Sequence, residues 1–527
     1  MERLAVVAAL SVCTMLAGAA SAQNAAGTAE RIAPVGRSAP TVTERTPEQM
    51  DAFAASHPLV GSPIVPFRPT MGDAEYRRLK AVANAQPRIA RPNVMSPIPL
   101  HGITGATAFA GGNANENASL GQGGWVPPDT EGAIGASQFV QTANNYINVY
   151  SKTGVLLSSR SLTSFMGSPT NTFDSRVQWD SLWGRWVVTS DTFPISTTEQ
   201  LFYWAVSKTA SATGAWWVYS WNTNSVTGTG SFWDFPSLGL QQDSMIFTAN
   251  VFGSTSSFLG ASTFAVPKAQ VYNGQSVYFS IFGGLDGTLQ PPHVLKQDET
   301  GFAWLAAAAS GGIKMYRYEN ASSPDNNILT GPYTVTGVPA YSAPPSAVQP
   351  SPCGGGTNAV DTSDTRFVNA STQYGDLLYQ VHSVNAGTAT PRYYVISGLS
   401  SSAPTVHETG LFWNTSTSSD WNASIAADAS DNLVITYSSV DSGYNAQVRY
   451  VGRQHGDAAI SGGGVGASLH QSGACLTGDY DSSFGVQRWG DYSAVTLDPI
   501  TAKTFWIINE DIIDASTWGN EIGKVHF

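Results

Sequence analysis

Charged residues are scarce: they make up 12% of the 527 residues, about half the usual share. Acidic residues outnumber basic ones, the formal net charge is −12, and no extended run of Lys or Arg occurs. Nucleic-acid-binding proteins and proteins that attach to anionic membranes depend on clustered positive charge, so both classes are excluded. Tyr, Trp, Ser, Thr, Asn and Gly fill the gap, a composition typical of exported β-proteins with polar, uncharged surfaces.

Several catalytic motifs are also missing. The chain has no G-x-S-x-G nucleophile elbow, no P-loop and no G-x-G-x-x-G between a strand and a helix. It has eight His but no H-E-x-x-H or H-x-x-x-H pair, so a zinc site has little support.

The longest apolar run is at the N-terminus, in MERLAVVAALSVCTMLAGAASAQ. It ends in Ala20-Ser21-Ala22, an A-x-A-like cleavage signal, and predicts a signal peptide over residues 1–22. The alternative is an uncleaved anchor, but the run is shorter than the roughly 20 residues that a span needs. We therefore expect a secreted or periplasmic protein with no membrane span.

Cysteine is rare, with three residues in the chain. Signal removal leaves Cys353 and Cys475, which an oxidising compartment would join in one disulfide. Two separate buried thiols are the alternative.

Residues 23–120 differ from the rest and predict an N-terminal extension, a spacer or pro-region that packs on the main domain. Thr46-Pro47-Glu48-Gln49 is a capping-box pattern with Pro at the first helical position, and it predicts a short helix. A second short helix is expected over DAEYRRLKAVANA, capped by Asp73.

Residues 121–527 predict an all-β domain, because short aromatic and β-branched runs alternate with Gly/Asn/Asp/Ser turns. A weak hairpin repeat is visible seven times, with units starting at Ala133, Arg176, Ser237, His293, Arg366, Ser424 and Ser493. Seven units of about four strands describe a seven-bladed β-propeller. A pair of β-sandwiches or a jelly roll is the alternative.

The residues just before each repeat are the main candidates for a site. If the repeats begin with the innermost strands, these residues gather at one end of the central channel and form a binding funnel. The predicted funnel consists of Asp129, Glu131, Asp174, Arg176, Asp234, His293, Asp364, Arg366, Arg488 and Asp491.

Three segments resemble a family of secreted bacterial sialidase-like (BNR-type) β-propellers. They are PPDTEGAIG from Pro127, DSRVQWDSLWGRW from Asp174 and RWGDYSAVTLDPITAKTFW from Arg488. The resemblance spans most of the chain after Trp125, and it implies a propeller that acts on or binds sugars. Sialidases clamp a carboxylate with three arginines, for which Arg176, Arg366 and Arg488 are candidates, but no clean Asp-box repeat occurs here.

Asp129 and Glu131 form a candidate carboxylate pair for acid/base catalysis or cation binding. The alternative for Asp129 is a turn-fixing role after Pro127-Pro128. Asp174 and Asp491 complete the set of candidate catalytic acids.

The spacing D-x-R occurs twice, in Asp174/Arg176 and Asp364/Arg366. Residues two apart on a strand share a face, so each pair can form a salt bridge or hold an anionic group. A structural link between neighbouring blades is the alternative.

Arg488-Trp489-Gly490-Asp491-Tyr492 suits a sugar site, with Trp489 or Trp233 as a stacking platform and Arg488, Asp491 and Tyr492 as polar contacts. It suits ring closure equally. His293 is either an imidazole of the channel or a structural residue.

Asp479-Tyr480-Asp481 resembles the start of a calcium loop, although the closing Glu is missing. Structural Ca²⁺ at Asp479 and Asp481 is therefore one expectation, and no other cofactor is expected.

These observations predict a monomeric propeller that binds, and hydrolyses or eliminates, an extracellular and acidic carbohydrate. The competing hypothesis is a non-catalytic surface module that binds protein or glycan.

Overall fold

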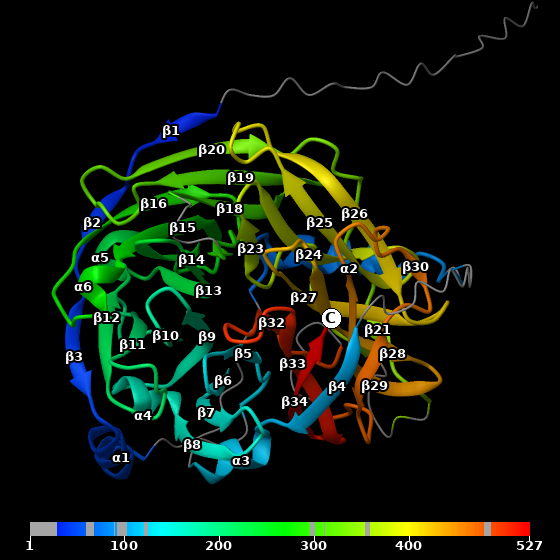
Figure 1. The fold of residues 1–527 in the computed structure, drawn as a ribbon, viewed down its shortest axis with the longest axis horizontal. Coiled ribbons are helices and arrows are strands. Elements are labelled where there is room, and N and C mark those ends of the chain that lie inside the picture. Colours follow the sequence, from blue (N-terminus) through cyan, green and yellow to red (C-terminus); the bar gives the residue numbers. More distant parts are fainter. Residues whose placement is uncertain are drawn as a thin grey trace, which may run out of the picture.

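The computed structural model describes residues 29–58, 68–88, 90–91, 103–120, 125–295, 301–309, 311–351, 353, 359–478 and 486–527. Its sheets are arranged in a ring around a central channel, so the prediction of an all-β propeller is confirmed (Figure 1). The predicted signal peptide, residues 1–22, lies outside the described residues. No helix in the described part of the chain is long and apolar enough to cross a membrane.

Five sheets are separate blades, each of four or five antiparallel strands. Blades are named here after their first strand in chain order among residues 131–527. The β5 blade contains β5 (Glu131–Ile134), β6 (Gln138–Ala143), β7 (Tyr146–Ser151) and β8 (Leu156–Ser161). The β9 blade contains β9 (Thr172–Asp180), β10 (Arg185–Thr192), β11 (Leu201–Ser207), β12 (Trp216–Asn222) and β3 (Thr41–Arg45).

The other three separate blades follow later in the ring. The β18 blade contains β18 (Phe302–Ala309), β19 (Gly312–Glu319), β20 (Ile328–Thr334) and β1 (Glu30–Ile32). The β27 blade contains β27 (Ser419–Ala427), β28 (Leu433–Asp441), β29 (Tyr444–Arg453) and β31 (Ala467–Gln471). The β32 blade contains β32 (Ala494–Leu497), β33 (Thr504–Asp514), β34 (Thr517–His526) and β4 (Thr104–Ala110).

The remaining channel strands belong to one eleven-stranded sheet. One half holds β2 (Gly36–Ser38), β16 (Phe279–Leu285), β15 (Phe258–Pro267), β14 (Ser244–Phe252) and β13 (Phe232–Leu240). The other half holds β23 (Ser371–Tyr374), β24 (Leu377–Asn385), β25 (Ala389–Ser397), β26 (Thr405–Trp413) and β30 (Gly462–Gly463). The short strand β17 (Pro292–Val294) joins the halves by pairing in parallel with both β13 and β23.

The prediction of seven separate blades is therefore wrong: five blades are separate, and the rest merge through β17. Pro291 and Pro292 lack an amide hydrogen, which limits the hydrogen bonds that this segment offers to a hairpin partner. The strands on either side of β17, β13 and β23, pair with it instead of a hairpin partner. A two-stranded sheet, β21 (Ala347–Val348) with β22 (Ala359–Val360), completes the strands.

The N-terminal extension is part of the ring. β1, β2 and β3 add outer strands to three successive sheets along the rim, where Figure 1 draws them in dark blue. β4 pairs with β34, the last strand of the chain, so a segment from the N-terminal side completes the final blade. This pairing closes the ring with strands from both ends of the chain.

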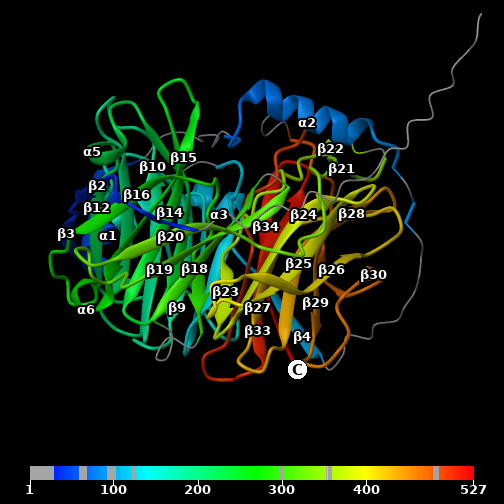
Figure 2. The same ribbon diagram turned by 90° about the horizontal axis from the view of Figure 1, so that it is seen from above.

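Six helices connect the sheets: α1 (Pro47–Ser56), α2 (Asp73–Ala85), α3 (Ala114–Ser119), α4 (Leu162–Met166), α5 (Asn224–Thr227) and α6 (Lys268–Val271), counted over the described residues. α1 begins with the capping box of Thr46 and Gln49 that its sequence indicates. α2 is capped by Gly72 rather than by the expected Asp73, which is its first helical residue. α2 lies across one face of the propeller (Figure 2).

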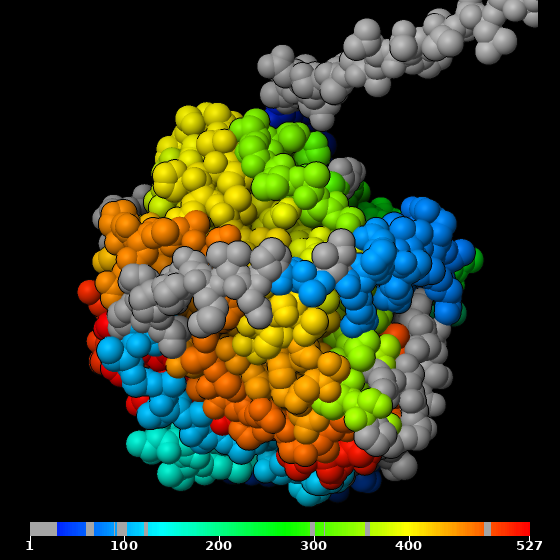
Figure 3. All heavy atoms as spheres, turned by 90° about the vertical axis from the view of Figure 1, so that its right-hand side faces the viewer, coloured from blue at the N-terminus to red at the C-terminus, as the bar shows by residue number. Residues whose placement is uncertain are grey.

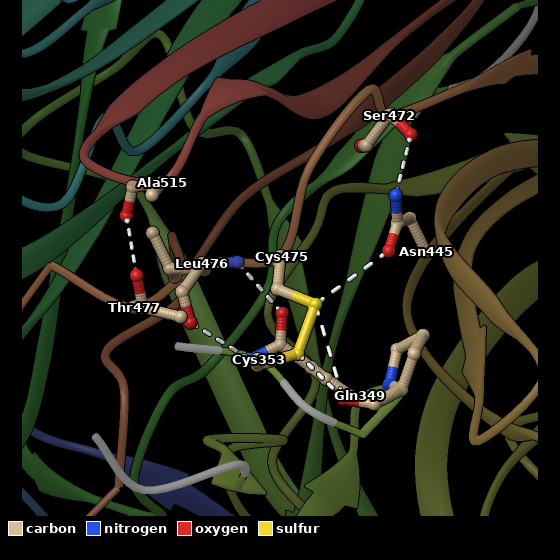
Figure 4. The surroundings of a disulfide bond; sticks show 9 residues. Gln349, Cys353, Asn445, Ser472, Cys475, Leu476, Thr477 and Ala515 are labelled. Atoms are coloured by element: carbon tan, nitrogen blue, oxygen red, sulfur yellow. Dashed lines mark hydrogen bonds between the residues drawn. A yellow bond between two sulfur atoms is a disulfide. The ribbon is translucent and has the colours of Figure 1, made fainter. Parts of the chain in front are cut away.

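The core lies between the sheets. All nine residues of β9, β13, β14, β27 and β28 are buried, as expected of strands covered on both faces. Cys353 and Cys475 form a disulfide across 122 residues of sequence, so that prediction is confirmed (Figure 4). Beside it, Gln349 and Leu476 exchange two hydrogen bonds of 2.8 Å, which hold the same two loops together.

Candidate functional site

The central channel has two regions with different chemistry. The first, here called the channel cavity, has a volume of about 90 Å³ and is lined mainly by residues of β5, β9, β17, β23, β27 and β32. At its rim, Ser181 is exposed and Leu295 and Pro499 are partly exposed. The second, here called the charged mouth, has a free volume of only about 10 Å³ among Asp361, Asp364, Arg366, Arg488 and Asp491, together with the adjoining Asp129, Asp174 and Asp234.

Most of the predicted funnel residues lie together at the charged mouth. The members found there are Asp129, Asp174, Asp234, Asp364, Arg366, Arg488, Trp489, Asp491 and Tyr492. None of them is more than 8% exposed. These groups are therefore buried rather than open to solvent, and the N-terminal extension contacts this region through Arg68, which lies 3.4 Å from Asp234, and Lys80, which lies 3.7 Å from Asp361.

Asp129 joins the first repeat to the last. Its Oδ1 accepts the backbone N–H of Asp491 at 2.7 Å, and its Oδ2 accepts the side-chain amide of Asn144 at 2.6 Å. Burial, followed by the negative charge of Asp491, raises the pKa of Asp129 to about 7. The partner of Asp129 is 362 residues away in sequence, so its role extends well beyond a local turn.

Arg176 marks the boundary between the mouth and the cavity. Its Nη1 donates to Glu131 at 3.0 Å, and its guanidinium lies 3.3 Å from the centre of the Tyr492 ring. Two further bonds, to the carbonyls of Pro236 and Val368, fix the guanidinium in place. Its donors are thus directed at the β5 blade, at β13 of the eleven-stranded sheet and at the segment just before β23.

The two D-x-R pairs behave differently. Asp364 binds Arg366 through both carboxylate oxygens, as the spacing predicts. Asp174 and Arg176 do not pair: Asp174 accepts the Tyr492 hydroxyl at 2.8 Å, and Arg176 binds Glu131. Asp174 has a φ of 50° in a bulge of β9, where Asp174 and Ser175 lie opposite Ser190 alone in β10, and this breaks the strand alternation that the prediction assumed.

The Arg488–Tyr492 segment is built into the ring closure. Arg488 binds Asp491 through two hydrogen bonds of 2.9 and 2.7 Å. A Cβ at Gly490 would lie 2.8 Å from Glu510 Oε2 and 3.1 Å from the Asp129 nitrogen, so only glycine fits this approach. The ring-closure interpretation of this segment therefore has direct geometric support.

The two proposed stacking platforms have no open face in this state. Trp489 is 2% exposed and packs against Trp421, with ring centres 5.2 Å apart. Trp233 is fully buried. Neither indole can receive a sugar ring here.

His293 is at the other end of the channel. It pairs with Leu240, six residues along β13 from Asp234 and hence about 20 Å away. The repeat alignment placed it wrongly, because Pro291-Pro292 and the turn before it shift this unit along the channel axis. His293 instead lines the channel cavity, where burial lowers its pKa to about 4.

Glu131 also lines the channel cavity, as the carboxylate among its described lining residues. Burial raises the pKa of Glu131 to about 7, although the charge of Arg176 acts in the opposite direction. A carboxyl that titrates near neutral pH and contacts a cavity can exchange protons with a ligand.

Sequence reasoning missed several buried ionisable groups. Burial, and then the charge of Asp174, raise the pKa of Asp191 well above its usual range, and neither of its carboxylate oxygens has a hydrogen-bond partner among the described residues. Glu510 accepts the Gly490 N–H at 2.7 Å, and burial raises its pKa too. Asp191 follows an apolar run, and only its position in a buried strand could have drawn attention to it.

The predicted calcium ligands Asp479 and Asp481 lie outside the described residues. Within the described part, no group of three or more His, Cys, Asp or Glu side chains is arranged to hold a metal ion. Structural Ca²⁺ therefore stays a prediction.

No protein-family model matches the chain, and no curated protein matches it. Among solved structures, it is similar to the Dos1 propeller, at 8% identity and a TM-score of 0.36, over 74% of this chain and 75% of that one. A Trypanosoma rangeli sialidase in complex with sialic acid matches at 11% identity and a TM-score of 0.34, over 72% of this chain and 57% of the sialidase. A GH43 endo-arabinanase from Bacillus licheniformis matches at 10% identity and a TM-score of 0.27, over 53% of this chain and 96% of the arabinanase. At these scores, the similarities carry no argument about activity.

Proposed function

We propose that this protein is an exported β-propeller that binds a carbohydrate in the channel cavity, with Glu131 as its central recognition group. The observation that carries the proposal is the position of Glu131: a carboxyl with a pKa of about 7, held by Arg176, at the wall of the channel cavity.

The lining of the cavity matches the chemistry of a sugar. Hydroxyl, amide and imidazole groups line the cavity and have the chemistry to pair with sugar hydroxyls, from Gln178, Ser181, His293, Ser371, Thr372, Ser424, Ser493 and Thr496. Ile134, Val177 and Trp179 supply apolar surface for the C–H faces of the rings. The two oxygens of Glu131 suit a pair of neighbouring hydroxyls.

Hydrolysis is a second candidate, favoured by the carboxyls of the charged mouth. A glycosidase needs one protonated and one ionised carboxyl on either side of the scissile bond. Asp129, with its pKa of about 7, would supply the acid, and Asp491, bound to Arg488, would supply the carboxylate. Asp174 is linked to this pair because it accepts the hydroxyl of Tyr492, the residue that follows Asp491.

The test is a binding screen of the purified protein against neutral and acidic oligosaccharides and polysaccharides, with parallel assays for released sugars. Glu131→Gln should weaken binding by roughly tenfold or more, because a charge-assisted hydrogen bond is worth ~1.5–3 kcal/mol. Glu408→Gln is the matched control, since Glu408 forms a Glu–Arg pair at 2.8 Å with Arg453, away from the cavity lining. Retention of no glycan, or equal loss in both variants, would overturn the proposal.

EDTA in a parallel arm tests the proposed calcium site. If Asp479 and Asp481 bind structural Ca²⁺, EDTA should lower the Tm, and added Ca²⁺ should restore it. A glycan that binds Glu408→Gln and Glu131→Gln equally, with no product formed, would favour a non-catalytic surface module.

Export, the monomeric state and membership of the sialidase-like (BNR-type) family are further parts of this proposal. The Cys353–Cys475 disulfide supports an oxidising compartment.

A further inference from the structure

The charged mouth is covered by a segment of the N-terminal extension, here called the strap: residues 68–88 with 90 and 91. The strap starts at the β13 end of the mouth, where Arg68 contacts Asp234 at 3.4 Å and stacks on the Phe232 ring at 4.0 Å. It ends beyond the mouth, where Arg91 donates to the carbonyl of Ser418 at 2.6 Å. Figures 2 and 3 show α2, in the middle of the strap, as a blue ridge on the surface of the propeller.

α2 inserts polar and aromatic side chains into the propeller. Tyr76 is 1% exposed and lies near the charges of Asp361, Asp364, Arg366 and Arg488. Lys80 is 9% exposed, and its ammonium donates to the carbonyls of Pro344 and Ser363 and to the Thr362 hydroxyl, at 2.8 to 3.1 Å. Tyr76 and Lys80 are thus buried among polar partners of the propeller, as the side chains of a bound peptide are in a binding site.

The charges of the strap complement those of the mouth. Each mouth arginine is bound to its own carboxylate: Arg176 to Glu131, Arg366 to Asp364 and Arg488 to Asp491. The mouth contains four further carboxyls, on Asp129, Asp174, Asp234 and Asp361, and that of Asp361 also lies 3.9 Å from Arg488.

The strap supplies cations to two of these four. Arg68 contacts Asp234, and Lys80 contacts Asp361 at 3.7 Å. Burial raises the pKa of both Asp129 and Asp174, which favours their neutral forms. Without the strap, Asp234 and Asp361 each lose a cationic neighbour, and this loss favours a cation in the same two positions.

The strap can leave without dismantling a sheet. It lies between β3 and β4, which are each paired as outer strands of a blade. Within α2, the buried residues are Tyr76, Lys80 and Ala83, all in contact with or facing the propeller, while Arg78 is exposed. Loss of these contacts leaves every described strand pairing intact.

We propose that the charged mouth is a recognition site for a basic, tyrosine-bearing helical peptide, and that the strap is its intramolecular occupant. The strap thereby acts as an autoinhibitory plug, since Asp234 and Asp361 reach a ligand only after Arg68 and Lys80 leave them. A basic segment of another polypeptide competes with the strap for the mouth. This inference does not depend on the sugar proposed for the channel cavity.

The direct test uses a protein in which residues 68–91 are replaced by a Gly/Ser linker of equal length. It is titrated with a synthetic peptide of residues 68–91, which should bind. The unaltered protein should bind the same peptide at least ~100-fold more weakly, because a tethered strap has an effective concentration on the order of mM.

Two variant peptides establish specificity. Lys80→Glu should weaken binding by roughly tenfold or more, because it places a carboxylate among Asp361 and three oxygen acceptors. Arg78→Glu makes the same charge change on the exposed face of α2 and should bind about as well as the original peptide. A folded strap-replaced protein that binds none of the peptides, or binds all three equally, would overturn the proposal.

If the strap-replaced protein does not fold, the full chain provides a second readout. In the Lys80→Glu protein, the amides of α2 should exchange with solvent much faster, while the blade strands keep their protection. The Arg78→Glu protein should exchange like the unaltered one. Unchanged protection of α2 in the Lys80→Glu protein would refute a plug held by mouth contacts.

Discussion

Replacement of Glu131 by glutamine should change how the stability of the protein depends on pH. The pKa of Glu131 is raised from 4.5 to about 7, because burial disfavours the carboxylate more than Arg176 favours it. In the unfolded chain the same carboxyl titrates near its ordinary value. The folded state therefore binds one more proton than the unfolded state between the two pKa values.

The sign and the size follow from this difference in proton binding. The stabilising effect of the bound proton is fully present below pH 4.5 and is lost as the pH rises through about 7. At about 1.4 kcal/mol per pH unit, the pKa difference corresponds to an upper limit of ~3 kcal/mol. The amide that Glu131→Gln introduces has no proton to lose in this range, so the variant should gain ~3 kcal/mol relative to the unaltered protein between pH 4.5 and pH 8.

Urea unfolding of both proteins from pH 4.5 to pH 8 measures this gain. Asp364→Asn is the control, since it also removes a buried carboxylate from an arginine. Burial acts to raise the pKa of Asp364, but the charge and hydrogen bonds of Arg366 outweigh it, and the pKa lies below 3.8. The stability difference between the control and the unaltered protein should therefore stay constant from pH 5 to pH 8. Parallel pH profiles for Glu131→Gln and the unaltered protein would refute the reasoning.

Two further substitutions test the closure of the ring. Cys353→Ser opens the bond to Cys475, which spans 122 residues, and should lower the free energy of unfolding by roughly 2–5 kcal/mol in urea titrations; an unchanged midpoint would contradict a disulfide in the folded protein. Asp129→Asn places an amide donor against the Asn144 donor, whose own oxygen already accepts the Asp174 N–H, and should lower the unfolding free energy by ~1–3 kcal/mol. Full stability of Asp129→Asn together with lost turnover would assign Asp129 to catalysis instead.

Much of the fold could be predicted from the sequence because its strands follow local rules. Apolar runs between turn residues mark the buried strands, and the capping box of Thr46 marks α1. The number of separate blades could not be predicted, because it depends on where β17 finds its partners. Three residues that pair sideways with β13 and β23 convert two sheets into one, and a pattern read along the chain does not contain this information.

The arrangement of the candidate site residues could also be predicted from the sequence only in part. The repeat brought Asp129, Asp174 and Asp491 to one place correctly, since each stands before or at the start of a channel strand. It failed for the D-x-R pair of Asp174, where a positive φ turned the backbone away from strand geometry. The covering of the mouth could not be foreseen either, because the partners of Lys80 lie more than 260 residues further along the chain.

Carboxyl groups bound to arginine therefore have different roles in the two regions of the channel, the charged mouth and the channel cavity. At the mouth, Asp364 and Asp491 are each bound through two oxygens to an arginine of the same short segment, Arg366 and Arg488, and these pairs fix the local backbone. At the boundary, Arg176 joins Glu131 to the carbonyl of Pro236 in β13 and to that of Val368, and Glu131 also lines the channel cavity. A carboxyl that served closure alone would gain nothing from contact with this cavity, since that contact brings in water and weakens the ion pair. Glu131 thus has a structural partner in Arg176 on one side and the proposed ligand site on the other, which is why its substitution tests both stability and binding.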